Sequence, residues 1–439
     1  MLASVGGLST SVSGVIAVTV LCAAWWVLEP IPIPATSMLP FALLPICGAA
    51  SHKTVAAAYG HPMVLLLLGG FLLSAALEES GVHRRIALAL IRLTGTGGRR
   101  LILGFMIATA ICSMWISNTA TTLMMLPIAI AVVPPGSAMS APLFLGIAYS
   151  ASIGGIGTPI GTPPNMVLMG VYEEMAGGQI SFLNWMMIGV PVVLFLLPIA
   201  WIWLTRNAKD STVVELPRQG LWRSAEKRSL FIFALAALLW MTRQNPAGGW
   251  SAWAGLGKDV HDSTVAMGCA ALLFIVPSGD SRPLLTWERA RQIPWGILLL
   301  FGGGIAIAKG FESTGLSTLL GRFLIDDIGL LNMAPVLMMA LIALTVTFLT
   351  EVTSNTATTT LLMPILATAG LSAGVDPVVL MLPAALSASC AFMLPVATAP
   401  NAIVYGSGRV STALMAREGV VLNLIGAFVI VVVLTVFSP

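Results

Sequence analysis

The chain has 439 residues, of which 57% are hydrophobic and only 9% are charged, and its net charge is +3. Soluble domains carry about 25% charged residues, so this composition excludes a water-soluble fold and predicts a membrane protein. The sequence contains no basic block of the kind found in nucleic-acid-binding proteins, so no nucleic-acid partner is expected.

The cysteines and histidines form no metal or redox motif. The five cysteines are scattered through apolar segments without CxxC spacing, and the four histidines are isolated. We interpret the cysteines as buried thiols without disulfides. The histidines are interpreted as surface or interface residues, with a metal or proton-relay role as the alternative. Because no HExxH, Walker lysine or Ser-His-Asp order is present, we predict neither an enzyme nor an organic cofactor.

Apolar runs long enough to cross about 30 Å of hydrocarbon recur along the chain. They lie at 12–28, 33–50, 61–77, 141–171, 184–205, 229–242, 263–277, 293–308, 376–405 and 419–437. The first run lacks the basic start and the cleavage-like end of a signal peptide, so it is predicted to be a membrane helix. The sequence therefore predicts an all-α polytopic membrane protein with about 10 transmembrane helices.

Two further segments, 101–133 and 333–369, carry the same polar stretch at their middle. The first contains Ser117, Asn118 and Thr119, and the second contains the same triplet at 354–356. Each half-segment has only about 15 residues, which is short for a membrane span. We therefore predict two re-entrant hairpins with the triplets at their tips, an arrangement allowed where irregular backbone is buried in protein or lines a cavity.

The segments 82–99 and 315–325 look amphipathic, and in the first of them His83, Arg84 and Arg85 alternate with apolar residues. They are predicted to lie along the membrane interface and to hold the hairpins, with a solvated loop helix as the alternative.

Lysine and arginine set the expected orientation, because they concentrate in cytoplasmic loops. With both hairpins re-entrant, 16 of the 21 basic residues fall in loops on one side, and the others are Lys53, Arg243, Lys258, Lys309 and Arg322. If either hairpin were a full crossing, the later loops would change sides and the asymmetry would shrink. The side with 16 basic residues is therefore predicted to be cytoplasmic, with both chain ends outside.

The hairpins belong to a longer internal repeat. Gly69 pairs with Gly303 at a separation of 234, the triplets pair at 237, and residues 162–165 pair with 398–401 at 236. The predicted units are 1–205 (the first repeat, spans 1–5 with hairpin 101–133), 206–228 (a cytoplasmic linker) and 229–439 (the second repeat, spans 6–10 with hairpin 333–369). An odd number of crossings inverts the second copy, and transporters use inverted repeats to place a substrate site at the membrane midplane.

Glycine and proline interrupt two of the long apolar runs at matched repeat positions. The first cluster runs from Gly154 to Asn165, and the second runs from Pro395 to Asn401. Because proline removes an amide donor and glycine adds backbone freedom, we predict that both helices are broken, with a simple proline kink as the alternative. A break frees carbonyl groups that can ligate a cation, and it creates a helix N-terminus with partial positive charge.

The hairpin tips and the helix breaks together predict one site of neutral, hard oxygen ligands. Hydroxyl, amide and backbone carbonyl oxygens suit Na⁺ better than soft or doubly charged metals. The Asn and Thr donors and the helix N-termini suit an anion. No Lys or Arg lies within the triplets or the breaks, so the anion would be neutralised mainly by co-bound cations, which couples the two ligands.

The paired triplets, each followed by a Thr/Pro/Asn helix break, resemble the divalent anion/sodium symporter family of di- and tricarboxylate transporters. The likeness runs from about Gly69 to the C-terminus. The resemblance implies a homodimer, in which a scaffold region forms the dimer interface and a transport region moves by an elevator mechanism.

Matching the family's motifs residue by residue implies two sodium sites and one substrate site. One sodium site would use Ser113, Ser117, Asn118 and the backbone near Gly161, and the other would use Thr350, Asn355 and the backbone near Ala397. The substrate carboxylates would meet Ser117, Asn118, Thr119, Ser354, Asn355 and Thr356, flanked by Thr162, Pro163 and Thr398.

The sequence departs from the family pattern in two places. Ala399 stands where the family usually has proline, which would alter the packing beside the substrate. The chain also begins without the extra N-terminal span common in the family, which agrees with an external N-terminus and equally with a truncated start.

Three charged residues within the apolar segments need an explanation. Glu351 is an acid in a predicted membrane hairpin, and we favour structural hydrogen bonding or tuning of the site over direct ligation. Lys309 and Glu312 are predicted to form an interfacial ion pair.

We therefore predict sodium-coupled symport of a divalent anion, in the first place a C4-dicarboxylate such as succinate or malate, across the bacterial inner membrane. An exchanger, a proton-coupled carrier, a tricarboxylate carrier and a sulfate transporter on the same fold remain open, as does a passive anion channel. The hydroxyls of Ser113 and Thr350 favour sodium, because basic residues there would favour exchange. Membrane lipid and a second copy of the chain are the expected partners.

Overall fold

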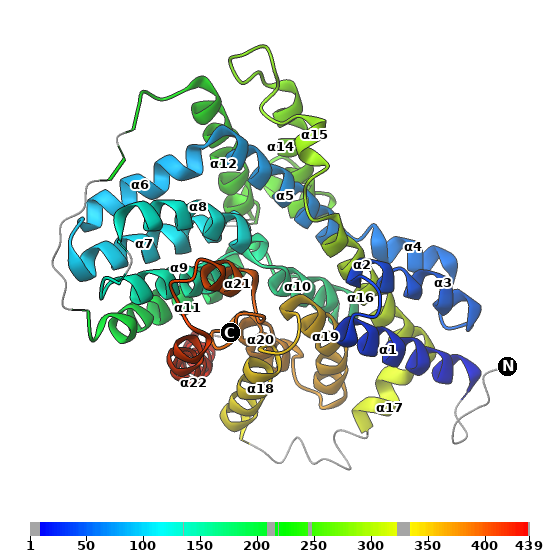
Figure 1. The fold of residues 1–439 in the computed structure, drawn as a ribbon. Helices are drawn as coiled ribbons and strands as arrows, with labels where there is room; N and C mark the ends of the chain where they lie inside the picture. Colours follow the sequence, from blue (N-terminus) through cyan, green and yellow to red (C-terminus); the bar gives the residue numbers. More distant parts are fainter. Residues whose placement is uncertain are drawn as a thin grey trace.

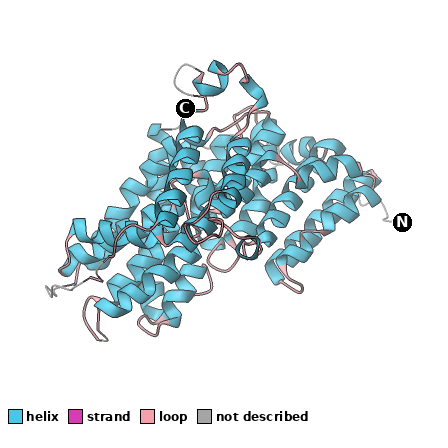
Figure 2. Ribbon diagram, turned by 90° about the horizontal axis from the view of Figure 1, so that it is seen from above, coloured by secondary structure: helices cyan, strands magenta, loops and turns pink. Residues whose placement is uncertain are grey.

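The structure is a computed structural model that describes residues 9–134, 136–208, 216–217, 219–244, 248–322 and 334–437. Within these ranges the chain is helical and forms no named β-strand, and an isolated β-bridge joins Pro277 and Pro283. Figure 1 shows the order of the helices along the chain, and Figure 2 shows the same helical arrangement from above. The prediction of an all-α fold is confirmed.

The described residues of the first half, up to residue 205, contain eleven α-helices. They are α1 (Thr10–Leu28), α2 (Ile33–Thr36), α3 (Leu39–Ile46), α4 (His52–Tyr59), α5 (Pro62–Ser80), α6 (Val82–Thr94), α7 (Gly98–Ser113), α8 (Asn118–Val132), α9 (Ser140–Gly155), α10 (Pro163–Ala176) and α11 (Phe182–Thr205).

The described residues of the second half contain α12 (Ser224–Thr242), α13 (Gly249–Trp253), α14 (Asp262–Ile275), α15 (Trp287–Ala290), α16 (Trp295–Thr314), α17 (Leu316–Arg322), α18 (Pro335–Leu349), α19 (Asn355–Ser372), α20 (Val378–Ser387), α21 (Ala399–Gly406) and α22 (Thr412–Phe437).

Five helical stretches in the described residues are long and apolar enough to cross a membrane by themselves. They are Thr10–Leu28, His52–Ser80, Phe182–Thr205, Trp295–Thr314 and Thr412–Val436. The other apolar stretches are shorter, including Ile33–Ile46, Asp262–Ile275 and Val378–Ser387. Short and interrupted helices are stable in lipid only when neighbouring protein satisfies their free backbone groups.

Each Ser-Asn-Thr triplet lies at a turn between two short helices, as the hairpin prediction requires. α7 and α8 flank the first triplet, α18 and α19 flank the second, and the four helices have between 15 and 18 residues. Ser117 and Ser354 are the N-cap residues of α8 and α19, and their hydroxyls accept hydrogen bonds from the backbone N–H groups of Ala120 and Ala357. Serine is a preferred N-cap because its oxygen satisfies an amide that has no partner within the helix.

Both predicted helix breaks are present. α9 ends at Gly155, a single 3₁₀ turn follows at Pro159–Gly161, and α10 begins at Pro163. In the second half α20 ends at Ser387, and α21 begins only at Ala399. The runs 141–171 and 376–405 are therefore pairs of half-helices, and the alternative of a simple proline kink is wrong.

The two halves of the chain interlock through these elements. α8 packs against α9 of its own half and against α21 of the other half. In the corresponding way α19 packs against α20 and against α10. Each hairpin is thus held between one half-helix of each half of the chain, which brings the two triplets and the two breaks toward one region.

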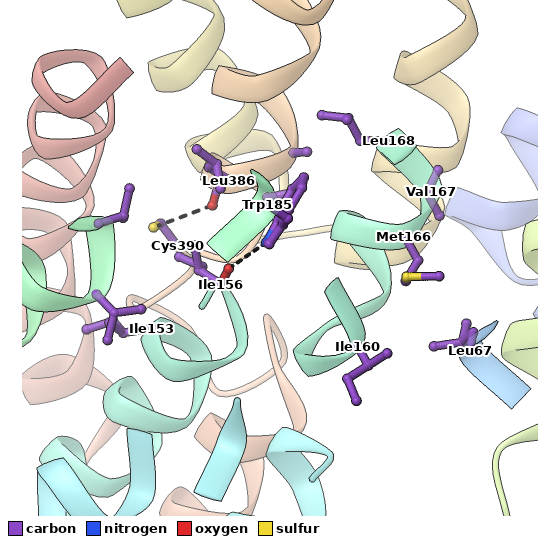
Figure 3. Packing of buried hydrophobic residues seen from close by; sticks show 14 of the residues in the cluster. Leu67, Ile153, Ile156, Ile160, Met166, Val167, Leu168, Trp185, Leu386 and Cys390 are labelled. Atoms are coloured by element: carbon purple, nitrogen blue, oxygen red, sulfur yellow. Dashed lines mark hydrogen bonds between the residues drawn. The ribbon is translucent and has the colours of Figure 1, made fainter. Parts of the chain in front are cut away.

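A buried aromatic residue supports the first break. The Trp185 side chain on α11 is fully buried, and its Nε1 donates a hydrogen bond of 2.9 Å to the Ile156 carbonyl oxygen at the end of α9. Figure 3 shows this contact beside Cys390 of the second break, whose Sγ lies 3.7 Å from the Leu386 carbonyl oxygen. Buried residues near both breaks therefore lie side by side. The Trp185 side chain also satisfies a carbonyl group that the interrupted helix leaves free.

The amphipathic prediction agrees with α6. Its apolar face buries Ala87, Leu88 and Ile91, and the helix packs against α7 of the first hairpin. The second predicted segment, 315–325, is helical in α17 up to Arg322, and its last residues lie outside the described residues.

α12 begins at Ser224, within the segment predicted as the linker 206–228, and the Glu226 carboxylate there accepts a hydrogen bond of 2.8 Å from the Arg223 N–H.

One sequence-based expectation is wrong. The predicted pair of Lys309 with Glu312 is replaced by a pair with Glu174 on α10, at 2.9 Å between Nζ and Oε1. Glu174 reaches Lys309 because α10 packs against α16. This contact cannot be read from the spacing of residues in the sequence.

Close packing of α5 on α14 gives a test of the fold. A Cβ atom on Gly69 would stand 2.6 Å from the Ala266 Cβ, whereas nothing lies within 4 Å of a Cβ built on Gly268 of α14. Gly69→Ala is therefore expected to lower stability by about 1–3 kcal/mol through overpacking. Gly268→Ala is the matched control and should be neutral or slightly stabilising. Melting temperatures of the detergent-solubilised variants measure the difference, and equal melting temperatures would contradict the α5–α14 packing.

Candidate functional site

One cavity of about 600 Å³ reaches both hairpin tips and both helix breaks. All the site residues predicted from the sequence line it except Ser113 and Thr350. The predicted residues that line it are Ser117, Asn118, Thr119, Gly161, Thr162, Pro163, Ser354, Asn355, Thr356, Ala397 and Thr398. The fold therefore brings together residues that are more than 230 positions apart in the sequence.

Ser113 and Thr350 lie behind the two asparagines and are fully buried. Ser113 Oγ is 2.6 Å from Asn118 Oδ1 and 2.7 Å from the Ala151 carbonyl oxygen. Thr350 Oγ1 contacts Asn355 Oδ1 in the same way and is 3.2 Å from the Ala388 carbonyl oxygen.

These contacts place three oxygen atoms together with one hydroxyl proton among them. A hydroxyl can donate to only one acceptor at a time, so in each cluster one oxygen–oxygen contact has no hydrogen between its lone pairs. A small cation beside such a cluster would be stabilised by the oxygen atoms that accept no hydrogen bond from the hydroxyl group.

Glycine leaves space at the first of these clusters. A Cβ atom on Gly155 would stand 2.8 Å from Asn118 Oδ1 and 3.2 Å from the Gly161 carbonyl oxygen. Both oxygens therefore face the small volume that a side chain at this position would fill. The corresponding position of the second half, 236 residues later, is Ala391. The two clusters are thus similar in their donors and different in their available space.

An asparagine side chain bridges each helix break. Asn165 Nδ2 donates to the carbonyl oxygens of Gly155 and Thr158, at 2.9 and 2.7 Å. Asn401 Nδ2 donates to those of Ala391 and Leu394, at 3.1 and 3.0 Å. The motif Thr-x-Pro-Asn drew attention to these residues, but its spacing did not reveal that the asparagines hold the breaks closed. Among the described residues, neither Asn165 Oδ1 nor Asn401 Oδ1 has a hydrogen-bond partner.

Glu351 holds the loop of the second break. Its two carboxylate oxygens accept hydrogen bonds from the backbone N–H groups of Met393 and Leu394, at 2.9 and 3.0 Å. Oε1 also accepts one of 2.7 Å from Asn423 Nδ2 on α22. Glu351 is buried and does not line the cavity, so the structure gives it the hydrogen-bonding role. Asn423 was missed, and its only sequence signal is a single amide within the apolar run 419–437.

Ala399 begins α21 at the position where Pro163 begins α10. Thr162 has φ −148° and ψ 143°, and Thr398 has φ −142° and ψ 151°, so both residues enter the following half-helix with the same backbone conformation. Proline and alanine are both compatible with the first position of a helix. The backbone therefore enters both half-helices along the same path beside the cavity, and the altered packing of Ala399 beside the substrate stays a prediction.

The electrostatics of the cavity come from helix ends and neutral dipoles. The N-caps of α8, α19, α10 and α21 all line it, and they are Ser117, Ser354, Thr162 and Thr398. A helix N-terminus favours negative charge. Within the described part of the chain, no lysine or arginine lines this cavity, and Glu29 is its one acidic residue.

The helical fold and its five long apolar stretches first define the class of protein, a polytopic helical membrane protein. The YdaH transporter of Alcanivorax borkumensis has the same fold, with a TM-score of 0.62 and 15% identity over 98% of both chains. MtrF of Neisseria gonorrhoeae, described as illuminating a class of antimetabolite efflux pumps, matches with a TM-score of 0.62 and 13% identity over 98% of this chain and 96% of its own. At these identities the likeness concerns the fold alone.

Sequence relatives then define the family. Residues 23–378 match the citrate transporter family. The sodium-dependent dicarboxylate transporter SdcS of Staphylococcus saprophyticus is 41% identical, over 97% of this chain and 86% of the relative. SdcS of Staphylococcus aureus strain MRSA252 is also 41% identical, with the same coverage. The chain therefore belongs to this family of carboxylate transporters and is not an enzyme, and its resemblance to the divalent anion/sodium symporters is confirmed.

The hydrogen bonds of Glu351 predict a specific effect of an isosteric change. Glu351→Gln puts an amide N–H₂ against one of the two backbone N–H donors and leaves that buried donor without an acceptor. We expect a loss of about 1–3 kcal/mol, seen as a lower melting temperature of the purified protein. Glu312→Gln, at an exposed position on α16, is the control and should leave the melting temperature unchanged. Equal stability of both variants would show that Glu351 does not hold the loop.

Proposed function

We propose that this protein is a sodium-coupled symporter of a divalent anion, in the first place a C4-dicarboxylate such as succinate or malate. One observation carries the proposal. Four helix N-termini and two asparagine–hydroxyl oxygen clusters meet at a single cavity, and none of the described residues that line it is basic. The helix N-termini compensate only part of the negative charge of a bound anion. A cation at each oxygen cluster would supply the positive charge that remains to be compensated.

The proposed sodium ligands fit the chemistry of the ion. At the first site they are Asn118 Oδ1, Gly161 O and the hydroxyls of Ser113 and Ser117. At the second site they are Thr350, Asn355 and the backbone near Ala397. All are neutral, hard oxygens, which suit Na⁺. The space at Gly155 between Asn118 Oδ1 and the Gly161 carbonyl supports the first site most directly.

The proposed dicarboxylate lies between the two hairpin tips. Each carboxylate would take hydrogen bonds from one Ser-Asn-Thr triplet, with Thr162, Pro163 and Thr398 on the flanks. Two donor sets of the same composition in one cavity suit a substrate with a carboxylate at each end. The names of the Staphylococcus relatives, sodium-dependent dicarboxylate transporter, support the same substrate class and coupling ion.

The same proposal includes an inverted-topology repeat, with 1–205 and 229–439 as its two units, and transport by an elevator motion in a homodimer of the bacterial inner membrane. The matched packing of the two hairpins, α8 on α9 and α21 and α19 on α20 and α10, supports the repeat. The matched hydrogen bonds of Asn165 and Asn401 support it as well.

The central experiment is uptake of radiolabelled succinate into proteoliposomes that contain the purified protein. We expect accumulation against the succinate gradient when external Na⁺ is present, and loss of accumulation when choline replaces Na⁺. Malate, citrate and sulfate are tested as competitors. Uptake that is independent of Na⁺ would contradict symport, and equilibration without accumulation would indicate a channel.

The asparagine pair provides the sharpest test of the site. Asn118→Ala and Asn355→Ala each remove an oxygen proposed to face both ligands, so we expect uptake to fall by at least about tenfold, the effect of about 1.4 kcal/mol. Asn184→Ala is the control, because this asparagine is exposed on α11 and does not line the cavity. Near-normal uptake by either cavity variant, in protein that is folded and inserted, would overturn the assignment.

The hydroxyls behind the asparagines should affect sodium more than substrate. We expect Ser113→Ala and Thr350→Ala to raise the Na⁺ concentration needed for half-maximal uptake, while the maximal rate at saturating Na⁺ changes less. A sodium titration at fixed succinate measures this. An unchanged sodium dependence in both variants would remove these hydroxyls from the ion sites.

A further inference from the structure

A second, smaller chamber adjoins the central cavity beside the first hairpin. Its volume is about 160 Å³. Ser74, Ser117 and Thr119 line both chambers. Beyond these shared residues, the smaller chamber is bounded by Glu78 on α5 and by Arg289 on α15. An anion that moved from the central cavity into this chamber would enter a space that Arg289 lines.

Arg289 is distinctive by its charge. It is the one basic side chain among the described residues that line either chamber, and the acids there are Glu29 and Glu78. Arg289 Nη2 donates to Glu78 Oε2 at 2.6 Å, and Nη1 donates to Gln292 Oε1 at 2.7 Å. The Arg289 side chain is 33% exposed, so the guanidinium is not enclosed by these partners.

This arrangement suits a carboxylate that is bound briefly. A guanidinium has five N–H donors in a planar fork that matches a carboxylate, and Glu78 and Gln292 engage only part of it. Glu78 also accepts a hydrogen bond of 3.3 Å from Ser74, which helps to fix it in place. Because Glu78 is already paired with Arg289, a passing anion would gain a contact without being held tightly.

We propose that Arg289, together with Glu78, forms a transient carboxylate-binding subsite on the path between the central cavity and the arginine-rich side of the protein. Arg289 binds one carboxylate of the transported anion, and Glu78 competes with that carboxylate and so sets the strength of the subsite. The inference rests on the proposed function, because it requires a carboxylate to travel through the cavity.

The two residues should have opposite effects, and only on one face. The experiment measures half-saturating succinate concentrations separately on each face, by uptake into right-side-out and inside-out oriented proteoliposomes with Na⁺ present. On the face that carries Arg289, Arg289→Gln should raise this concentration about threefold to fivefold, the size expected for a partly exposed charge pair. Glu78→Gln should lower it on the same face, and Arg289→Lys should retain part of the wild-type value. Values on the other face should stay unchanged.

Arg291→Gln is the matched control, because Arg291 follows α15, is exposed and lines neither chamber. If Arg289→Gln and Glu78→Gln both weakened uptake to the same extent, or if the charge exchange E78R/R289E restored wild-type values, the pair would be purely structural and the inference wrong. Equal effects on both faces would also overturn it. The Na⁺ dependence of succinate uptake by the wild-type protein tests symport separately. Sodium-independent uptake would contradict the proposed function, but the comparison of the Arg289 and Glu78 variants would still be valid.

Discussion

Satisfying the backbone at two broken helices is the constraint on which the rest of this structure depends. An interrupted helix in an apolar surround leaves carbonyl and amide groups free, and each free group costs several kcal/mol in hydrocarbon. The Asn165 and Asn401 side chains bridge these gaps by donating to two carbonyl groups each. With the gaps fixed in this way, the half-helices α10 and α21 can begin at the cavity and direct their N-termini into it.

Different residues satisfy the free backbone groups at the two breaks. At the second break the Glu351 carboxylate and Asn423 hold the loop amides. At the first break the position of Glu351 is taken by Met114, whose carbonyl oxygen accepts a hydrogen bond from the Thr158 hydroxyl. Gly155 leaves space at the first break, whereas Ala391 at the corresponding position of the second break carries a methyl group. Two oxygen clusters with similar donors but different support would differ in their affinity for a cation, so their occupation need not be equal.

Much of the site could be predicted from the sequence because its signals are local. The Ser-Asn-Thr triplets, the Gly/Pro clusters and their constant separation identify the hairpin turns and the breaks, since glycine and proline act on the backbone where they occur. The partners of Glu351 and Lys309 could not be predicted, because Asn423 and Glu174 are brought to them by helix packing. The Arg289–Glu78 pair likewise joins residues that are 211 positions apart.

The central claim is that each asparagine–hydroxyl cluster binds a cation and that the two triplets bind the anion between them. It is tested most directly by a high-resolution structure of the purified protein determined in Na⁺ and succinate. We predict ion density within ligand distance of Asn118 Oδ1 and the Gly161 carbonyl, a second density at Asn355, and succinate between the two hairpin tips. Succinate bound elsewhere, or bound between the tips in a sodium-free buffer with both clusters unchanged, would contradict the account.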